Sequence, residues 1–376
     1  MRRIPFFILA ILILTSCAKI KLQKQGQLIN KSSDWVMYGK NPGRTNEYPG
    51  SITLPLKLKW HLNASASIGR TILARDSVVF FSTMDGRIYA YNIETRKKVG
   101  YVKTEYNATS VVKDSALFIA RRYGDETLVK YCLMRGKKEW EFNAGDITTE
   151  PLILDDGIVV TALYKHIDYY DLANGESIWQ FETNKQIRSS PASDGEIIVF
   201  GCDDGIVYAI QKSNGKLKWE YETDGSVQAT AAIKNDVVYI GSNDFKFYAI
   251  NLQTGKLEWE FETNGQIFNA AAVTDSVVVF GSTDSFVYCL NRISGEQIWT
   301  FEAKSVISTS PLVCEDKIFI GSLDHHLYAL DKSTGGELWK FKAKGRIRSN
   351  PIIYENYLIL ASEDDELYVF ESNKQE

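Results

Sequence analysis

Six aspartates occupy the same turn of a repeated unit, and carboxylates placed in this way could bind a cation. Oxygen ligands of this kind suit calcium. The surrounding runs, such as Asp203-Asp204-Gly205, lack the alternating ligand spacing of an EF-hand loop. Aspartate at a turn also accepts hydrogen bonds from the amides that follow it. We therefore interpret these residues as turn residues and expect no metal site at Asp85, Asp204, Asp244, Asp284, Asp324 and Asp364.

Two arginines at another fixed position of the unit could bind an anion or the acidic loop of a partner. Arg188 follows Ile187, and Arg348 follows Ile347 four units further along the chain. In a closed ring of eight units, these arginines would face each other across one mouth of a central channel. We interpret both as solvated channel residues, and a site for an anionic ligand or an acidic partner is the alternative. The same position in other units holds Thr148, Gln228, Phe268 and Ser308.

Motifs of familiar enzymatic chemistry are not found in the sequence. It contains no nucleophile elbow, no P-loop, no dinucleotide-binding glycine motif and no zincin motif. The adjacent His325 and His326 would point to opposite faces of a strand, which disfavours a shared metal ion. We therefore expect no catalytic, cofactor-binding or metal-ligating residues, and we interpret the protein as not being an enzyme.

Four of the five cysteines lie within the repeats. Cys132 and Cys289 take the same place in units four apart, so they would lie on opposite sides of a ring and could not form a disulfide. We interpret these two, with Cys202 and Cys314, as small apolar residues of the interior. A C-x-x-C pair is absent, which argues against a redox or haem-attachment role.

The fifth cysteine, Cys17, ends an N-terminal leader. Met1-Arg2-Arg3 precedes an apolar run at 4–14 that is too short to span a membrane. The following Leu-Thr-Ser-Cys resembles the cleavage motif of bacterial lipoproteins, which implies that Cys17 becomes the lipidated first residue. Ala18 after the cysteine favours, by the same resemblance, a location on the periplasmic face of the outer membrane. The polar stretch 18–33 is rich in Lys and Gln, as expected of a flexible tether.

Charge is balanced along the repeats. The formal net charge of −4 becomes −6 once Arg2 and Arg3 are removed with the leader. Acidic and basic residues are interspersed, and we find no basic stripe in the sequence. Nucleic-acid binding needs a contiguous positive surface, so we do not expect it.

The repeated unit itself is marked by tryptophans about forty residues apart. Each unit contains four apolar runs of strand length, separated by turns rich in Gly, Asn and Asp. A repeat of this length and content predicts one four-stranded blade of a β-propeller. We interpret the tryptophans as packing residues between blades, and the Thr-Gly turn before them as a tight hairpin. The tryptophans are Trp140, Trp179, Trp219, Trp259, Trp299 and Trp339.

Extending the period backwards gives the number of blades. Trp60 lies two periods before Trp140, and Gly100 occupies the slot between them, so there are eight units. The last strand, 366–370, has no tryptophan strand after it, whereas 56–60 has no partner before it. Pairing the two closes the ring and removes exposed sheet edges. We expect an all-β, eight-bladed β-propeller of antiparallel four-stranded blades, closed by strands from both termini.

The domain assignment follows from these patterns. We assign 1–17 to a lipoprotein signal peptide, 18–33 to the tether, 34–55 to an N-terminal leading segment and 56–376 to the propeller.

The repeat motif Y-A-[LI]-[DN]-x-x-T-G-x-x-x-W over residues 56–370 resembles the pyrroloquinoline-quinone-type propeller repeat. Two branches carry this repeat: quinoprotein dehydrogenases, and the BamB lipoproteins of the outer-membrane assembly machinery. The lipoprotein motif, the single propeller and the length resemble the BamB branch. That resemblance implies a non-catalytic periplasmic scaffold, monomeric within a complex, that binds protein partners. The alternatives are a quinoprotein-like dehydrogenase and a sensor or adhesion propeller.

The resemblance also bears on cofactors and partners. In many quinoproteins an adjacent cysteine pair and a calcium ion grip the quinone, and this sequence has no Cys-Cys pair, so we expect no cofactor. The run 34–45 is similar to the start of the quinoprotein propellers. In the BamB branch, an aliphatic residue followed by Arg docks the barrel-forming subunit. The matching pair here is Ile187-Arg188, although the preceding loop, 183–186, is shorter than in that family.

Overall fold

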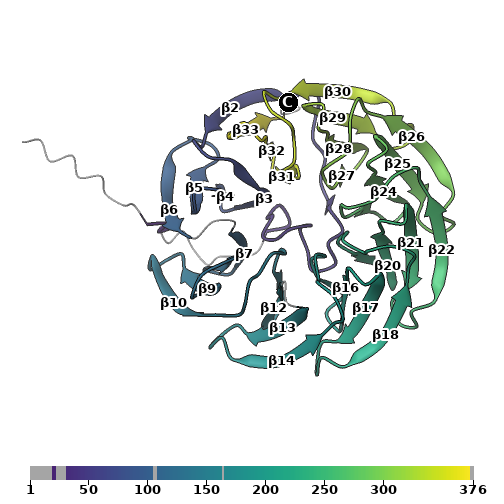
Figure 1. Ribbon diagram of the computed structural model, residues 1–376. Helices are drawn as coiled ribbons and strands as arrows, with labels where there is room; N and C mark the ends of the chain where they lie inside the picture. Colours follow the sequence, from purple (N-terminus) through teal and green to yellow (C-terminus); the bar gives the residue numbers. More distant parts are fainter. Residues whose placement is uncertain (1–18, 23–30, 105–107, 163–164, 373–376) are drawn as a thin grey trace, which may run out of the picture.

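The chain forms a ring of eight blades around a central channel (Figure 1). This structure is a computed structural model, and it describes residues 19–22, 31–104, 108–162 and 165–372. Seven blades have four antiparallel strands, and one gains a fifth strand. The predicted eight-bladed, all-β propeller is therefore confirmed. Cys17 and the signal peptide 1–17 lie outside the described residues.

Each blade runs from an innermost strand at the channel to an outermost strand at the rim (Figure 1). Blades 1 to 4 follow one another along the chain. Blade 1 contains β3 (Ile68–Arg75), β4 (Val78–Thr83), β5 (Arg87–Asn92) and β6 (Lys98–Lys103). Blade 2 contains β7 (Thr109–Lys113), β8 (Ala116–Ala120), β9 (Leu128–Cys132) and β10 (Lys137–Phe142). Blade 3 contains β11 (Leu152–Ile153), β12 (Gly157–Ala162), β13 (His166–Asp171) and β14 (Ser177–Glu182). Blade 4 contains β15 (Ala192–Ser193), β16 (Ile197–Gly201), β17 (Ile206–Gln211) and β18 (Leu217–Glu222).

Blades 5 to 7 continue the series in the same order. Blade 5 contains β19 (Ala232–Lys234), β20 (Val237–Gly241), β21 (Lys246–Asn251) and β22 (Leu257–Glu262). Blade 6 contains β23 (Ala272–Val273), β24 (Val277–Gly281), β25 (Phe286–Asn291) and β26 (Gln297–Glu302). Blade 7 contains β27 (Leu312–Cys314), β28 (Lys317–Gly321), β29 (His326–Asp331) and β30 (Glu337–Lys342). The short β1 (Glu47–Tyr48) of the leading segment pairs in parallel with β27 as the fifth strand of blade 7.

Blade 8 closes the ring with strands from both ends of the chain. It contains β31 (Ile352–Tyr354), β32 (Tyr357–Ala361), β33 (Glu366–Glu371) and, at the rim, β2 (Lys57–Asn63). The strands β2 and β33 are antiparallel, and Trp60 lies opposite Val369. The predicted closure is confirmed, and it leaves no gap between the first and last blades.

The tryptophans form the joints between blades. Six indole N–H groups donate to a backbone carbonyl of the next blade over 2.7–3.3 Å. The carbonyl lies 33 residues later for Trp60, Trp179, Trp219, Trp259 and Trp299, and 32 residues later for Trp140. The glycine of the next Thr-Gly turn lies against the indole ring. At Gly335, φ is +73°, and a Cβ would lie 2.6 Å from the ring of Trp299. Glycine is therefore required there both by the left-handed backbone and by the close approach of the ring.

The slot at Gly100 lacks a tryptophan, and the Lys19–Leu22 segment occupies it instead. Lys19 forms a parallel bridge with Tyr101, and Ile20 is fully buried among core residues of blades 1 and 2. The amide of Leu22 donates to the carbonyl of Leu133 over 2.9 Å. Leu133 lies 33 residues after Gly100, so a backbone amide replaces the missing indole N–H. These four residues fall within the range expected to be a tether, yet they pack on the propeller.

Gly100 makes this replacement possible. A Cβ at position 100 would lie 2.7 Å from the backbone of Lys19 and Ile20. The absent side chain thus leaves room for a second chain segment along β6.

No helix long and apolar enough to cross a membrane is found among the residues that the structure describes.

The tryptophan–glycine joint predicts different effects of alanine at two adjacent glycines. Gly335→Ala should lower the free energy of unfolding by about 2–4 kcal/mol, because it adds a left-handed alanine and a steric overlap. Gly336 lacks a positive φ, and its Cβ would meet only the Thr334 hydroxyl at 3.3 Å, so Gly336→Ala should be nearly neutral. Chemical denaturation of both variants measures the difference. Equal stabilities would contradict this account of the joint.

Candidate functional site: the central channel

The position after the buried aliphatic residue lines the channel, as predicted from the sequence. Thr148, Arg188, Gln228 and Phe268 border one cavity of about 130 Å³, and Arg348 borders a second. The aliphatic residues before them are buried; Ile187 is 0% exposed and packs in the same core cluster as Phe200. Of the predicted pair, only Arg188 is therefore accessible to a partner.

Arg188 is held by an ion pair at the channel mouth. Its Nε donates to Asp203 Oδ2 over 2.7 Å, and its Nη2 donates to Gln186 Oε1 over 3.1 Å. Asp203 also accepts a hydrogen bond from Gln228 of the next blade. About half of the Arg188 side chain, 53%, remains exposed. The arginine is thus oriented by its neighbours, while one side of its guanidinium faces solvent.

Arg348 lies four blades away, on the opposite side of the ring. Its Nε is 2.5 Å from Glu363 Oε1, and Arg346 contacts the other oxygen of the same carboxylate. Arg348 therefore shares its counter-ion with a second arginine. The predicted opposition of Arg188 and Arg348 follows from their places before β15 of blade 4 and β31 of blade 8.

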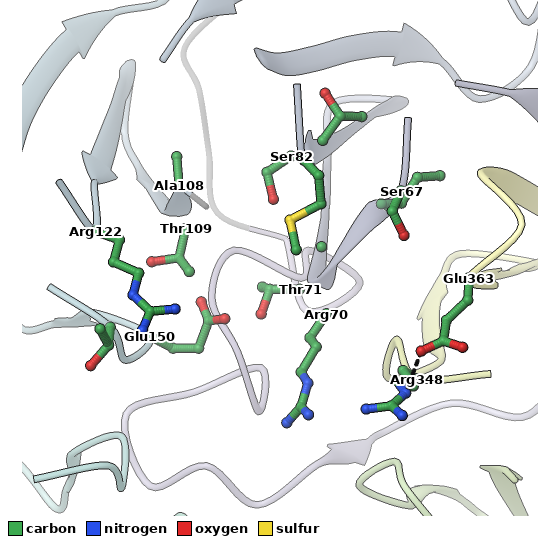
Figure 2. Close-up of a pocket in the computed structure, with 15 residues that line it drawn as sticks. Ser67, Arg70, Thr71, Ser82, Ala108, Thr109, Arg122, Glu150, Arg348 and Glu363 are labelled. Atoms are coloured by element: carbon green, nitrogen blue, oxygen red, sulfur yellow. Dashed lines mark ion pairs between the residues drawn. The ribbon is translucent and has the colours of Figure 1, made fainter. Parts of the chain in front are cut away.

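The larger cavity, of about 470 Å³, is lined by three arginines from neighbouring blades (Figure 2). Arg70 belongs to blade 1, Arg122 to blade 2 and Arg348 to blade 8. The two carboxylates in the lining are Glu150 and Glu363, and Glu363 is already ion-paired. With three guanidinium groups against two carboxylates, the cavity favours an anion over a cation.

The leading segment crosses the other end of the channel. Along its course, the carbonyls of Pro42, Gly43, Thr45 and Asn46 accept hydrogen bonds from amides of blades 4, 5, 6 and 7. The donating amides belong to Ser193, Ile233, Val273 and Val313, each five residues beyond the mouth position of its blade. The channel therefore has a mouth at one end and the leading segment as its floor.

Arg44 fixes this floor. It is fully buried, and its guanidinium donates to the carbonyls of Tyr38, Glu150, Pro151 and Pro191 over 2.6–3.2 Å. Burial lowers the pKa of Arg44 to about 10, so the side chain still carries its charge at neutral pH. Burial raises the pKa of the nearby Glu150, whereas Arg44 and Arg70 oppose that rise.

The residues of the cavity do not fit a quinone held by calcium. None of the described residues that line it is aromatic, so none offers a ring on which a planar cofactor could stack, and none is a cysteine. Within the described part of the chain, no group of three or more His, Cys, Asp or Glu residues could hold a metal ion. A hard cation such as calcium needs six to eight oxygen ligands. We therefore assign no chemical step to such a cofactor.

Four of the six repeated aspartates act as turn residues, as interpreted from the sequence. In four blades the carboxylate accepts a hydrogen bond from the amide two residues later and from the tyrosine hydroxyl four residues later. These aspartates are Asp204, Asp244, Asp284 and Asp324. The histidines near them make local contacts: His325 Nδ1 with the carbonyl of Lys344, and His326 Nδ1 with Asp324.

The four repeat cysteines are buried and unpaired, as expected of interior residues. Burial raises the pKa of Cys202 to about 11 and that of Cys289 and Cys314 to about 12. These thiols are therefore poor nucleophiles at neutral pH.

Sequence reasoning missed four channel residues: Arg44, Arg70, Arg122 and Glu150. Arg44 lies in the leading segment, outside the repeats, where no periodic comparison applies. The sequence does carry a signal for the second blade. Arg121 stands where other units have the Ser of Gly-Ser, and Arg122 stands where they have the residue after it. Comparing each unit position by position would have drawn attention to that deviation.

Comparison with known proteins supports this architecture. The family model described as Beta-alanine-activating enzyme, beta-propeller matches residues 125–376. No curated protein matches the chain. Among solved structures, BamB from Moraxella catarrhalis is similar, with a TM-score of 0.72 and 20% identity over 84% of this chain and 100% of that one.

Two further structures show the same fold. The computationally designed Ika8 protein has a TM-score of 0.74 and 17% identity, over 82% of this chain and 97% of that one. A europium-containing methanol dehydrogenase has a TM-score of 0.76 and 13% identity, over 92% of this chain and 99% of that one. The fold is thus common to a methanol dehydrogenase, to BamB and to a designed protein, so it does not determine the function of this chain.

The cavity chemistry predicts that pyrroloquinoline quinone and calcium do not bind. Titration of the purified protein with both should leave the melting temperature and the cofactor absorbance unchanged, because the described lining of the larger cavity offers no ring and no set of calcium ligands. Ligand binding at a hundred times Kd would stabilise the fold by about 2.7 kcal/mol, which is readily measured. A stoichiometric rise in melting temperature, with dye-coupled oxidation of an alcohol or sugar, would contradict the expectation.

Proposed function

The chain belongs to the family described as Beta-alanine-activating enzyme, beta-propeller, and we propose that it is a non-catalytic scaffold that binds protein partners. We place it in the periplasm, anchored to the outer membrane through Cys17, in the assembly of outer-membrane proteins. The proposed organisation keeps the signal peptide at 1–17 and the propeller at 56–376.

The observation that carries the proposal is the form of the channel mouth. Side chains at its border, such as Arg188 and Gln228, are oriented by hydrogen bonds to Asp203 on rigid blades. Fixed, half-exposed polar groups of this kind suit recognition of a protein surface, because little side-chain entropy is lost on binding. The similar fold of BamB, over the whole length of that chain, supports the same reading.

An enzyme is the second candidate function. It is favoured by the name of the matching family and by the dehydrogenase fold match. The chemistry of the larger cavity disfavours it, since Glu363 is ion-paired and the described lining offers neither a thiol nor an aromatic ring. A sensor or adhesion propeller has no specific observation in its favour.

Within the scaffold proposal, Arg188 is the residue that would meet a partner. Ile187 is buried, so the family's aliphatic contact is not available at this position. An acidic group of a partner could share the exposed side of the Arg188 guanidinium while Asp203 keeps the other. Bidentate pairing of arginine with carboxylates makes such an arrangement possible.

This role predicts different effects of two matched substitutions. Arg188→Ala should weaken capture of the barrel-forming assembly subunit from native membranes by roughly thirtyfold, the effect of about 2 kcal/mol lost at an interface centre. Arg348→Ala removes the same chemistry on the opposite side of the ring and should leave capture unchanged. Both variants must keep the parental melting temperature. Equal capture by the parent and both variants would contradict this role and would mean that Arg188 is a solvated channel residue.

A further inference from the structure

Charge is divided unevenly around the rim of the propeller. The outermost strands β30, β2, β6 and β10 lie next to one another (Figure 1) and together contain eight lysines and three glutamates. The other four outermost strands, β14, β18, β22 and β26, contain one lysine and seven glutamates. We call the first group the basic half-rim.

Strands β2, β6 and β10 follow one another along the chain, and ring closure adds β30 to them. Strand β30 (Glu337–Lys342) and strand β2 (Lys57–Asn63) lie at opposite ends of the chain, and blade closure makes them neighbours. The expectation of evenly mixed charge is therefore wrong for the rim, although the net charge of the chain is negative.

Many of these lysines are available to an external anion. Lys59, Lys138 and Lys340 pair with carboxylates of their own surface. Across the described part of the chain, the ion pairs leave five lysines of the basic half-rim unpaired, and each is exposed. These are Lys57, Lys98, Lys103, Lys137 and Lys342.

The Lys19–Leu22 segment leaves the propeller within this basic half-rim. It lies along Gly100 of β6 and near Gly136, just before β10. Only two residue steps separate Lys19 from Cys17, and such a stretch spans at most about 7 Å. A lipid on Cys17 would therefore bring this part of the rim close to the membrane surface. Lys19 and Lys21 are exposed and add two positive charges there.

We propose that the basic half-rim binds the phosphate headgroups of anionic lipids, so that the docked N-terminal segment and the lysines together hold one edge of the propeller against the membrane. The orientation rests on the proposed lipid anchor at Cys17, whereas the lipid affinity does not. Stable membrane attachment commonly combines an acyl anchor with a polybasic surface. The channel mouth and the acidic half of the rim then stay accessible to partners.

Vesicle binding by the full-length Cys17→Ser protein tests the affinity without the anchor. We expect binding to vesicles containing phosphatidylglycerol, and little binding to phosphatidylcholine vesicles. The triple variant Lys57→Gln/Lys103→Gln/Lys137→Gln should bind about a hundredfold more weakly, since each lysine near a charged membrane contributes roughly fivefold.

A matched triple variant controls for net charge. Lys216→Gln/Lys218→Gln/Lys256→Gln removes three exposed lysines from the opposite half of the ring and should bind like the parent. Equal loss in the two triples would overturn the proposal. So would equal binding to both kinds of vesicle, or tighter binding to a DNA duplex than to the anionic vesicles.

Orientation is tested in the lipidated protein. Lys97 and Lys256 take the same place in blades 1 and 5, on opposite sides of the ring, and both are exposed. A fluorophore at Lys97→Cys should be strongly quenched by lipids with nitroxide headgroups, and one at Lys256→Cys should not. Equal quenching would contradict the orientation.

Labelling with palmitate distinguishes failure of the anchor proposal from failure of the lipid-binding proposal. If the parent protein incorporates no labelled palmitate, the anchor proposal fails. Vesicle binding by Cys17→Ser still decides whether the basic half-rim binds lipid.

Discussion

Eight sheets meet at the axis of this propeller, and each presents there the free edge of its innermost strand. Unpaired amides at such edges are costly when water is excluded, and they invite wrong pairing. The leading segment satisfies several of them in turn, from the amide of Ser193 in blade 4 to that of Val313 in blade 7. Arg44 holds the segment in place through carbonyls of blades 3 and 4 and of the segment itself. This pairing gives the channel its floor and leaves one mouth, where the residues proposed to bind a partner lie.

At the perimeter, tryptophans join neighbouring blades, and the slot at Gly100 is the exception. Tryptophan of one blade and the turn of the next form a joint through an indole hydrogen bond, as between Trp219 and the carbonyl of Leu252. At Gly100 the chain near the N-terminus supplies both the apolar contact, through Ile20, and the hydrogen bond, through the amide of Leu22. The same exception that completes the ring thereby links the propeller to the proposed membrane anchor at a defined point of the rim.

More of the architecture than of the candidate site could be predicted from the sequence. The forty-residue period predicted eight blades, the closure of β2 on β33, and the opposition of Arg188 and Arg348, because each depends only on the position within the unit. Arg44 and Glu150 could not be found in this way, since their contacts depend on how a non-repeated segment crosses the channel. The expectation that Ile187 and Arg188 form one docking surface does not hold for Ile187, which is buried, and the role of Arg188 stays a prediction. The basic half-rim was missed because the inner strands of each blade separate its lysines in the sequence, and because closure brings β30 beside β2.

The central claim is that the leading segment, held by Arg44, secures the inner edges of the ring. Hydrogen–deuterium exchange of Arg44→Met measures this most directly. If the claim holds, the amides of Ser193, Ile233, Val273 and Val313 lose protection in the variant, while amides of rim strands such as β22 keep theirs. If these four amides stay as protected as in the parent, the segment does not depend on Arg44 and the account is contradicted.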